Sequence, residues 1–579
     1  MRGWLLNNEI ENEFNEMNKR IFLLLTIVFP LVAFAQPNHL VYSSFLTNET
    51  SAIGPKSSCT DSHGNVYVAG IIYNASLPTN ENSYDPNYNP NGNGWDGFIM
   101  QVTPDNQIGW CTYFGGERWD EIDAISCEND TLYVSMSTSS QEDITSINSV
   151  YPTRPAPLPE NQVLFPHIST WSITGELIYS SFLQYPISFQ SFSERFFYKN
   201  GYFYITSNGQ SNYPSYYSNE VSSGMADGYF AIFDKQGNFI YDRFLGGNKA
   251  EVIEDVFVDE DYIYCSLRAY SDTSSLYPPG YIPSSNLNLV LVKINQSTKD
   301  ILWTYAKSKP TGNSFHQDIF VDSNGTIYIH LSGSPSDFTP LDGQGGIQSA
   351  QITDTFFIEL NSNGVPVWSS YLPSNMYEVE MLEVDYNGKL LLYSTANTLT
   401  DSPQTPDNWG YATGPSQAYY MILTPEHNIA FASYLGGNDV SEYPTSCIFN
   451  NKLYAFFSSN SSDLIVTNDQ SPAAPGPTTG SSLFMHIFDD AVNIEENSRN
   501  KDAIQLFPSP TSANLTIQLP TNDNWTVRLY NMNGQVVSTE KINGNNRLDL
   551  NLQNFTSGLY TVQAMNDNGK VYTEVVVKE

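Results

Sequence analysis

The chain has 579 residues, of which 61 are acidic and 25 basic, so its formal net charge is −36. Such an acidic surface excludes nucleic acid and anionic membranes as partners. Aromatic residues make up 14% of the chain, which excludes a disordered acidic protein because those chains lack the large apolar side chains that build a core.

A short apolar run near the N-terminus has the features of a secretory signal peptide. Residues 21–34 form this run, which is shorter than the ~20 residues that a membrane-spanning helix needs. Two basic residues precede it, and Ala33 to Ala35 provide small residues for cleavage. Because residues 1–16 carry four Glu and one Arg, we expect translation to start at Met17 and the signal region to span residues 1–35.

Short strand-like motifs recur in a fixed order seven times over residues 36–490. Each copy has an inner pair, as in "CTDSHGNVYVAG" (59–70), and a third motif, as in "GFIMQVTPDNQ" (97–107). A fourth motif begins with an aromatic residue in every copy: Tyr42, Trp110, Tyr179, Tyr241, Trp303, Trp368 and Phe431. Apolar alternation between Asp, Asn and Gly turns predicts strands. Four strands per repeated unit predict an all-β fold, a seven-bladed β-propeller with Trp110, Trp303 and Trp368 buried as scaffold.

The phase of the repeats predicts how the ring closes. The first fourth-strand motif, "LVYSSFL" (40–46), precedes any inner strand, and the last copy ends after its third strand at "LFMHIFDD" (483–490). We therefore expect Val41, Tyr42 and Phe45 to pair with the strand around Phe484 to Phe488. Such pairing completes the last blade and removes exposed sheet edges.

The repeats resemble bacterial β-propeller repeats with the pattern tyrosine-serine-x-aromatic-leucine-glycine-glycine. The motifs "WCTYFGG" (110–116), "YDRFLGG" (241–247) and "FASYLGG" (431–437) carry it, whereas the copies that begin at Trp303 and Trp368 lack the glycine pair. The resemblance implies a seven-bladed propeller and an extracellular location. It implies no common reaction.

The C-terminal residues follow a different pattern. Residues 491–503 are charged and lack aromatic side chains, which is typical of a linker. The short strand-like motifs of residues 504–579, with an "NMNG" turn between two of them, predict a small β-sandwich.

This second domain resembles the type A C-terminal sorting domain of the type IX secretion system in Bacteroidetes. The segments "LYNMNGQVV" (529–537) and "SGLY" (557–560) and a last strand ending at Lys578 carry the resemblance, while Ser509 replaces the family's central Asn. The resemblance implies recognition by the type IX translocon and its sorting peptidase. It also implies a secreted or outer-membrane cell-surface location.

No sequence motif for a catalytic nucleophile, a zinc-binding helix or a phosphate loop occurs, so we expect no catalytic residues, metal or cofactor. The five cysteines are too few and odd in number for a disulfide framework, and we expect buried thiols. The scattered histidines, including His167 and His486, fit scaffold positions better than catalysis. Asp61 is expected to accept hydrogen bonds within a turn. The loop 85–96 leaves calcium open as a minor alternative.

The connections between second and third strands are long, as in 74–95 and 270–288, and should emerge on one face. Loops on a rigid scaffold are common recognition sites. Their aromatic rings could stack on sugars, anchor a protein, or simply pin the loops to the blades. The candidate ligand-binding residues are Trp95, Tyr217, Tyr281 and Trp409.

These observations predict an exported, non-enzymatic propeller that binds a glycan or protein ligand through its long-loop face. The alternative is a secreted carbohydrate-active enzyme, a lyase or glycosidase, with acidic residues on the same face. Glycosidases need two carboxyl groups about 5 to 9.5 Å apart. Two converging carboxylates in a cleft, one of them with a raised pKa, would favour the enzyme.

Overall fold

The computed structural model describes residues 40–47, 52–73, 76–81, 83–88, 94–140, 148–153, 164–183, 195–210, 226–283, 287–309, 316–332, 341, 355–372, 376–384, 389–397, 404, 414–464, 466–467, 480–489, 505–507, 511, 514–519, 524–531, 536–553, 555–567 and 571–578. The predicted signal region and linker lie outside these residues. The chain divides into two compact units, Met1–Asp489 and Asp490–Glu579. The described residues contain strands, turns and loops, and among them no helix is long and apolar enough to cross a membrane.

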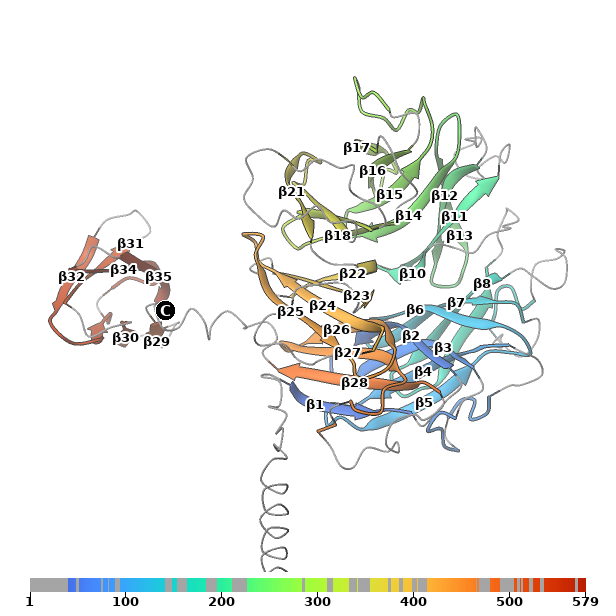
Figure 1. The fold of residues 1–579 in the computed structure, drawn as a ribbon, viewed down its shortest axis with the longest axis horizontal. Helices are drawn as coiled ribbons and strands as arrows, with labels where there is room; N and C mark the ends of the chain where they lie inside the picture. Colours follow the sequence, from blue (N-terminus) through green and yellow to red (C-terminus); the bar gives the residue numbers. More distant parts are fainter. Residues whose placement is uncertain are drawn as a thin grey trace, which may run out of the picture. The chain divides into compact units, whose positions relative to one another are not determined.

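The described part of the first unit forms seven four-stranded antiparallel sheets (Figure 1). Sheets 1 to 3 follow chain order: β2 (Ala52–Thr60), β3 (Val66–Tyr73), β4 (Asp96–Val102), β5 (Ile108–Phe114); β6 (Asp120–Glu128), β7 (Thr131–Thr138), β8 (Phe165–Ser172), β9 (Leu177–Phe182); β10 (Phe196–Lys199), β11 (Tyr202–Gln210), β12 (Ala226–Asp234), β13 (Phe239–Leu245).

Sheets 4 to 6 repeat the same order: β14 (Glu251–Val258), β15 (Tyr262–Ala269), β16 (Leu287–Asn295), β17 (Ile301–Lys309); β18 (His316–Val321), β19 (Ile327–Ser332), β20 (Thr355–Leu360), β21 (Pro366–Leu372); β22 (Met376–Glu383), β23 (Leu390–Asn397), β24 (Ser416–Leu423), β25 (Ile429–Leu435). Sheet 7 combines β26 (Ser441–Phe449), β27 (Lys452–Ser459) and β28 (Ser482–Asp489) with β1 (Leu40–Phe45).

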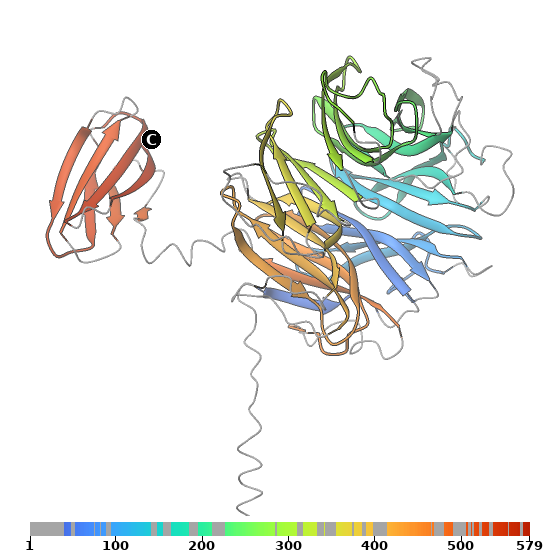
Figure 2. The same cartoon turned by 45° about the horizontal axis from the view of Figure 1, so that its top comes forward.

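The sheets bury their apolar faces against one another. One core joins sheets 7 and 1 through residues such as Val68, Met100, Phe456 and Met485, because neither sheet can cover its own alternating apolar side chains. The first strands lie toward the middle of the unit, where β2 contacts β6 and β26, and β18 contacts β14 and β22 (Figure 2). This arrangement places the first strands of different sheets within reach of one another.

The N-terminal strand closes sheet 7, as the phase of the repeats predicts. Tyr42 pairs with Ile487 and Phe45 with Phe484. Val41 differs from the prediction: it lies at a bulge between Leu40 and Tyr42, and its side chain is 46% exposed. The bulge turns this side chain out of the ladder.

Several fourth-strand rings contact the next sheet at the turn between its third and fourth strands. These contacts include Tyr42 Oη to the Asn106 carbonyl (3.2 Å), Trp110 Nε1 to the Ile173 carbonyl (3.0 Å), Tyr179 Oη to the Gln236 carbonyl (2.6 Å), and Trp368 stacked on His427 with ring centres 4.0 Å apart. The fourth-strand ring therefore joins neighbouring sheets.

The burial of these rings corrects the expectation that Trp110, Trp303 and Trp368 are all buried. Trp368 is buried, whereas Trp110 and Trp303 are half-buried. Their rings lie over Gly175 and Gly364, where a Cβ would come within 2.8 and 2.7 Å of the indoles. A glycine turn covers less of the ring than the stacked His427 imidazole does, so part of each indole stays exposed.

The second unit contains two antiparallel sheets around one core. One sheet has the order β29 (Gln505–Phe507), β30 (Asn514–Gln518), β33 (Arg547–Asn551), and the other β32 (Val536–Ile542), β31 (Trp525–Asn531), β34 (Gly558–Asn566), β35 (Val571–Lys578). Ile517 of the first sheet and Trp525 and Val562 of the second belong to the same hydrophobic cluster. The unit thus has a core of its own.

Candidate functional site

Two of the four residues predicted on the long-loop face can be placed. Trp95 packs against Tyr73 and Trp119, with ring centres 5.4 and 5.9 Å away, and Trp119 is 41% exposed. Tyr281 is half-buried, and its hydroxyl lies 2.8 Å from both Asn288 Oδ1 and Ser308 Oγ. Tyr217 and Trp409 lie outside the described residues. Trp95 belongs to sheet 1 and Tyr281 to sheet 4.

A ring of equivalent positions on the first strands, or directly before the first strand in sheet 3, carries the clearest charge pattern. Each of these residues faces the same position of the neighbouring second strand, as Ser57 faces Ala69 and Asp255 faces Ser266. We call the set the axial ring: Ser57, Ala124, Arg195, Asp255, Asp318, Glu380 and Thr445. Sheets 1, 2 and 7 have small neutral side chains there. Sheets 3 to 6 have one cation and three carboxylates.

Arg195 joins these three carboxylates. Its Nε lies 2.7 Å from Asp255 Oδ1, its Nη1 3.1 Å from Glu380 Oε1, and its Nη2 3.7 Å from Asp318 Oδ1. The Asp318 side chain is buried, whereas that of Glu380 is 51% exposed. Three sheets therefore bring their carboxylates to the guanidinium of a fourth, with one carboxylate open to solvent.

Backbone groups of the neighbouring first strands fix the two aspartates. Ile319 N donates to Asp255 Oδ2 at 2.8 Å, and Val379 N donates to Asp318 Oδ2 at 3.0 Å. His330 Nδ1 lies 3.2 Å from the same Asp318 oxygen. These bonds hold both carboxylates in place, as a preorganised site requires.

Burial changes the proton affinity of this group. It raises the pKa of Asp255 to about 6, even though Arg195 lies beside it and opposes the shift. The Asp255 carboxylate in turn raises the pKa of Arg195. A carboxyl group with a pKa near 6 can hold or release a proton close to neutral pH.

A second charged group lies beside the ring in sheets 1 and 2. Lys56 forms an ion pair with Glu121, and burial raises the pKa of the neighbouring Asp123 to about 7. Ser137 Oγ donates to Asp123 Oδ2 at 2.8 Å. Both Lys56 and Asp123 occupy bulges just before the ring positions Ser57 and Ala124.

One group resembles a metal site but is explained by turns. Ligand atoms of Asp61, His63 and Asp130 lie within 4.8 Å of one another. Asp61 accepts hydrogen bonds from the backbone N–H groups of His63 and Asn65, both at 2.9 Å, and from Tyr67 Oη at 2.8 Å. This confirms its expected role as a turn acceptor. The five cysteines are free thiols.

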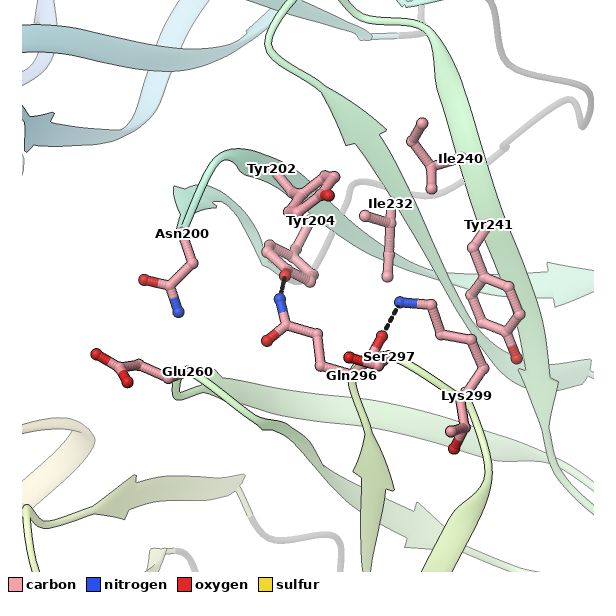
Figure 3. Close-up of a pocket in the computed structure, with 11 residues that line it drawn as sticks. Asn200, Tyr202, Tyr204, Ile232, Ile240, Tyr241, Glu260, Gln296, Ser297 and Lys299 are labelled. Carbon is pink, nitrogen blue, oxygen red and sulfur yellow. Dashed lines mark hydrogen bonds between the residues drawn. The ribbon is translucent and has the colours of Figure 1, made fainter.

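A cavity of about 650 Å³ lies between sheets 3 and 4, at the end of the sheets opposite the long second-to-third-strand connections (Figure 3). The turns β10–β11, β14–β15 and β16–β17 surround it. Its wall contains Asn200, Tyr202, Tyr204, Ile232, Ile240, Tyr241, Glu260, Gln296, Ser297, Thr298 and Lys299. No motif in the sequence indicated this cavity, because its wall comes from separate turns of two repeats.

Several solved structures share a weak likeness with the chain. They include the extracellular domain of a one-component system of B. thetaiotaomicron (12% identity, TM-score 0.35, 94% of this chain and 59% of that one) and the phage phi92 endosialidase (9%, 0.36, 77% and 68%). Trypanosoma rangeli sialidase is a third (8%, 0.33, 78% and 83%). TM-scores this low carry no conclusion about activity.

Among curated proteins, an endo-acting ulvan lyase of Formosa agariphila is 28% identical over 102 residues. The match spans 17% of this chain and 20% of the lyase, so the chain covers about a fifth of that relative. The expectation of a non-enzymatic protein is contradicted, because this relative is an enzyme.

The C-terminal unit matches a known family. Residues 505–578 match the model of the secretion system C-terminal sorting domain, and these residues include the strands β29 to β35. The segments around Leu529 and Tyr560 that carry the sequence resemblance lie on β31 and β34. The C-terminal unit is thus a secretion system C-terminal sorting domain, which indicates export through the type IX system to the cell surface or the extracellular space.

Proposed function

We propose that this protein is an exported carbohydrate-active enzyme that cleaves glycosidic bonds of a polysaccharide at the axial ring. The observation that carries the proposal is the convergence of Asp255, Asp318 and Glu380 on Arg195, with the pKa of Asp255 raised to about 6. The ulvan lyase relative supports the substrate class.

The four side chains divide the chemistry between them. Asp255, with its pKa raised to about 6, holds a proton in mildly acidic solution and is the candidate proton donor to the leaving oxygen. Glu380 is half-exposed beside Arg195 and is the candidate base or nucleophile. Arg195 positions both carboxylates through its ion pairs with them. Asp318 orients the guanidinium.

The experiment is an activity screen of the secreted protein on ulvan and on neutral polysaccharides. Unsaturated products that absorb ultraviolet light identify a lyase, and new reducing ends without such absorbance identify a glycosidase. Glu380→Gln and Asp255→Ser should each lower the rate by roughly 10²–10⁴-fold, as the loss of an acid or base does. Activity should also fall as the pH rises above about 6, where Asp255 loses its proton. Activity equal to that of the parent protein in both variants would refute the assignment.

We further propose that the seven sheets are the blades of one closed seven-bladed propeller, spanning residues 36–490, and that residues 504–579 fold as a small β-sandwich. The closure of sheet 7 by β1 and the single core of the second unit support this reading. During export the partners are the type IX translocon and its sorting peptidase. Trp95, Tyr217, Tyr281 and Trp409 stay candidates for ligand contact on the long-loop face.

A further inference from the structure

The cavity between sheets 3 and 4 has an unusual balance of charge. Lys299 and Glu260 both line it. The Lys299 ammonium donates to the Gln296 carbonyl and lies 5.5 Å from the centre of the Tyr241 ring (Figure 3). Glu260 and Lys299 carry opposite charges, so these two residues give the wall no surplus charge that would select an anion or a cation.

Polar groups in the wall are left for a ligand. Within the part of the chain that the structure describes, the Glu260 carboxylate and the Tyr202 and Ser297 hydroxyls have no hydrogen-bond partner. A purely apolar ligand would bury these groups without compensation, which is unfavourable. A ligand rich in hydroxyl groups can donate to the carboxylate and also exchange bonds with both hydroxyls.

Apolar surface is exposed next to these polar groups. The side chains of Tyr202 and Ile240 are 37% and 38% exposed, and Figure 3 shows them on one side of the cavity, with Glu260 and Ser297 on the opposite side. An aromatic face beside hydroxyl-binding groups suits the C–H face and the hydroxyl edge of a sugar ring. The volume of about 650 Å³ falls within the range of about 300–1,000 Å³ typical of ligand sites.

The wall is also preorganised. With its amide oriented to suit all its neighbours, Gln296 accepts a hydrogen bond from Tyr204 Oη at 2.7 Å and donates to the carbonyls of Asp259 and Glu260 at 3.2 and 2.8 Å. This residue therefore ties the β16–β17 turn of sheet 4 to β11 of sheet 3 and to the β14–β15 turn. A wall fixed before binding loses little freedom when a ligand binds.

We infer that this cavity is a binding site for a neutral saccharide, separate from the axial ring and on the opposite end of the sheets from the long loops. It extends the proposed function, on which the choice of a glycan partly rests, by giving the enzyme a second contact with its polysaccharide. Tyr202 supplies the stacking face, and Glu260 and Ser297 bind the hydroxyl groups.

Calorimetric titration of the full chain tests the site with named probes. Cellotetraose, xylotetraose and mannotetraose are the neutral ligands, and tetragalacturonate and chitosan tetramer are the charged comparators. We expect saturable binding of at least one neutral probe, and weaker binding of both charged ones. Failure of all three neutral probes, or a preference for a charged one, overturns the inference.

Three variants locate the binding. Tyr202→Ala should weaken it at least about tenfold, while Tyr202→Phe, which keeps the ring, should weaken it less. Tyr443→Ala removes a tyrosine that is 60% exposed elsewhere in the unit and should bind like the parent protein. Unchanged affinity in Tyr202→Ala overturns the inference.

Two further variants keep the test decisive. If Tyr202→Ala does not fold, Glu260→Gln should still weaken binding by about tenfold through the loss of a charged acceptor. Glu380→Gln, titrated in parallel, should lose turnover and keep its affinity. Binding of a neutral probe by a parent protein that shows no activity on any polysaccharide would refute the proposed enzyme and leave the saccharide site standing.

Discussion

Replacing Arg195 by Met should destabilise the first unit at neutral pH. The guanidinium is 2.7 Å from Asp255 and 3.7 Å from Asp318, whose side chains are 10% and 5% exposed. A buried charge that loses its partner costs about 3–5 kcal/mol. Glu380 is half-exposed and can be solvated instead, and Arg195 is itself 31% exposed. We therefore expect about 3 kcal/mol, at the lower end of that range.

The loss of stability in Arg195→Met should be smaller in acid than at neutral pH. The direction of this pH dependence follows from the pKa of Asp255. Without Arg195 this pKa rises further above its present value of about 6, while the unfolded chain keeps a value near 4. The folded variant therefore holds a proton that the unfolded chain releases between these values. The stability gained from that proton is present at low pH and is lost as the pH rises through the folded pKa. As the pH falls from the folded pKa of the variant to about 6, the deficit relative to the parent should shrink by up to about 1.4 kcal/mol per pH unit. Below about pH 6 the parent's Asp255 is protonated as well, so the deficit should then stay constant.

Urea unfolding at about pH 7.5 and about pH 5, followed by tryptophan fluorescence, measures both quantities. Lys249→Met is the matched control, because its 2.8 Å pair with Asp272 is exposed on both sides and should contribute less than about 1 kcal/mol. The unfolding of the C-terminal unit should not change in either variant. A deficit below about 1 kcal/mol at the higher pH, or one that grows in acid, would refute the reasoning.

Three further predictions test the contact of a fourth-strand ring with the next sheet, a buried histidine and the sorting domain. At Gly175 φ is +87° and a Cβ would lie 2.8 Å from Trp110, so Gly175→Ala should lower the free energy of unfolding in urea by about 2–3 kcal/mol. Gly280→Ala, which has open space around the new Cβ, should lower it by only about 1 kcal/mol. Burial lowers the pKa of His167 to about 3, so below about pH 6.5 the unfolded chain takes up a proton that the folded chain does not. The free energy of unfolding of the parent should therefore fall below that pH by about 1.4 kcal/mol per pH unit, relative to that of His167→Leu. Deletion of residues 504–579 should hold the folded first unit in the periplasm, as fractionation and circular dichroism would show, whereas its normal release would contradict a sorting role.

The strands and their order could be predicted because the repeats report them directly. Alternating side chains and short turns determine which residues pair, and the phase of the copies places Tyr42 opposite β28. Burial of the fourth-strand rings was harder to predict. It depends on what the next sheet offers at its turn: His427 covers Trp368, whereas Gly175 and Gly364 leave Trp110 and Trp303 half-exposed.

The axial ring could not be predicted because its members do not align in the sequence. Bulges of differing size precede the ring position in five first strands, for example between Ile253 and Asp255 and between Tyr377 and Glu380. Each bulge shifts the spacing between the turn and the ring position. The ion pair between Arg195 and Glu380 also joins residues 185 positions apart. Charged residues inside otherwise apolar inner strands were the available signal.

Sheet packing alone does not account for the carboxylates of the ring. In sheet 1 the same position is Ser57, whose hydroxyl accepts a hydrogen bond from Ile125 N at 3.2 Å. Asp255 accepts the equivalent bond from Ile319 N, and Asp318 accepts one from Val379 N, yet the burial of these two carboxylates carries a desolvation cost that a serine avoids. The fold therefore requires a hydrogen-bond acceptor at this position but not a charged one. Asp255→Ser should accordingly keep the fold while removing the proton donor, so a stable but inactive variant separates the two roles, and an unfolded one would assign Asp255 to structure.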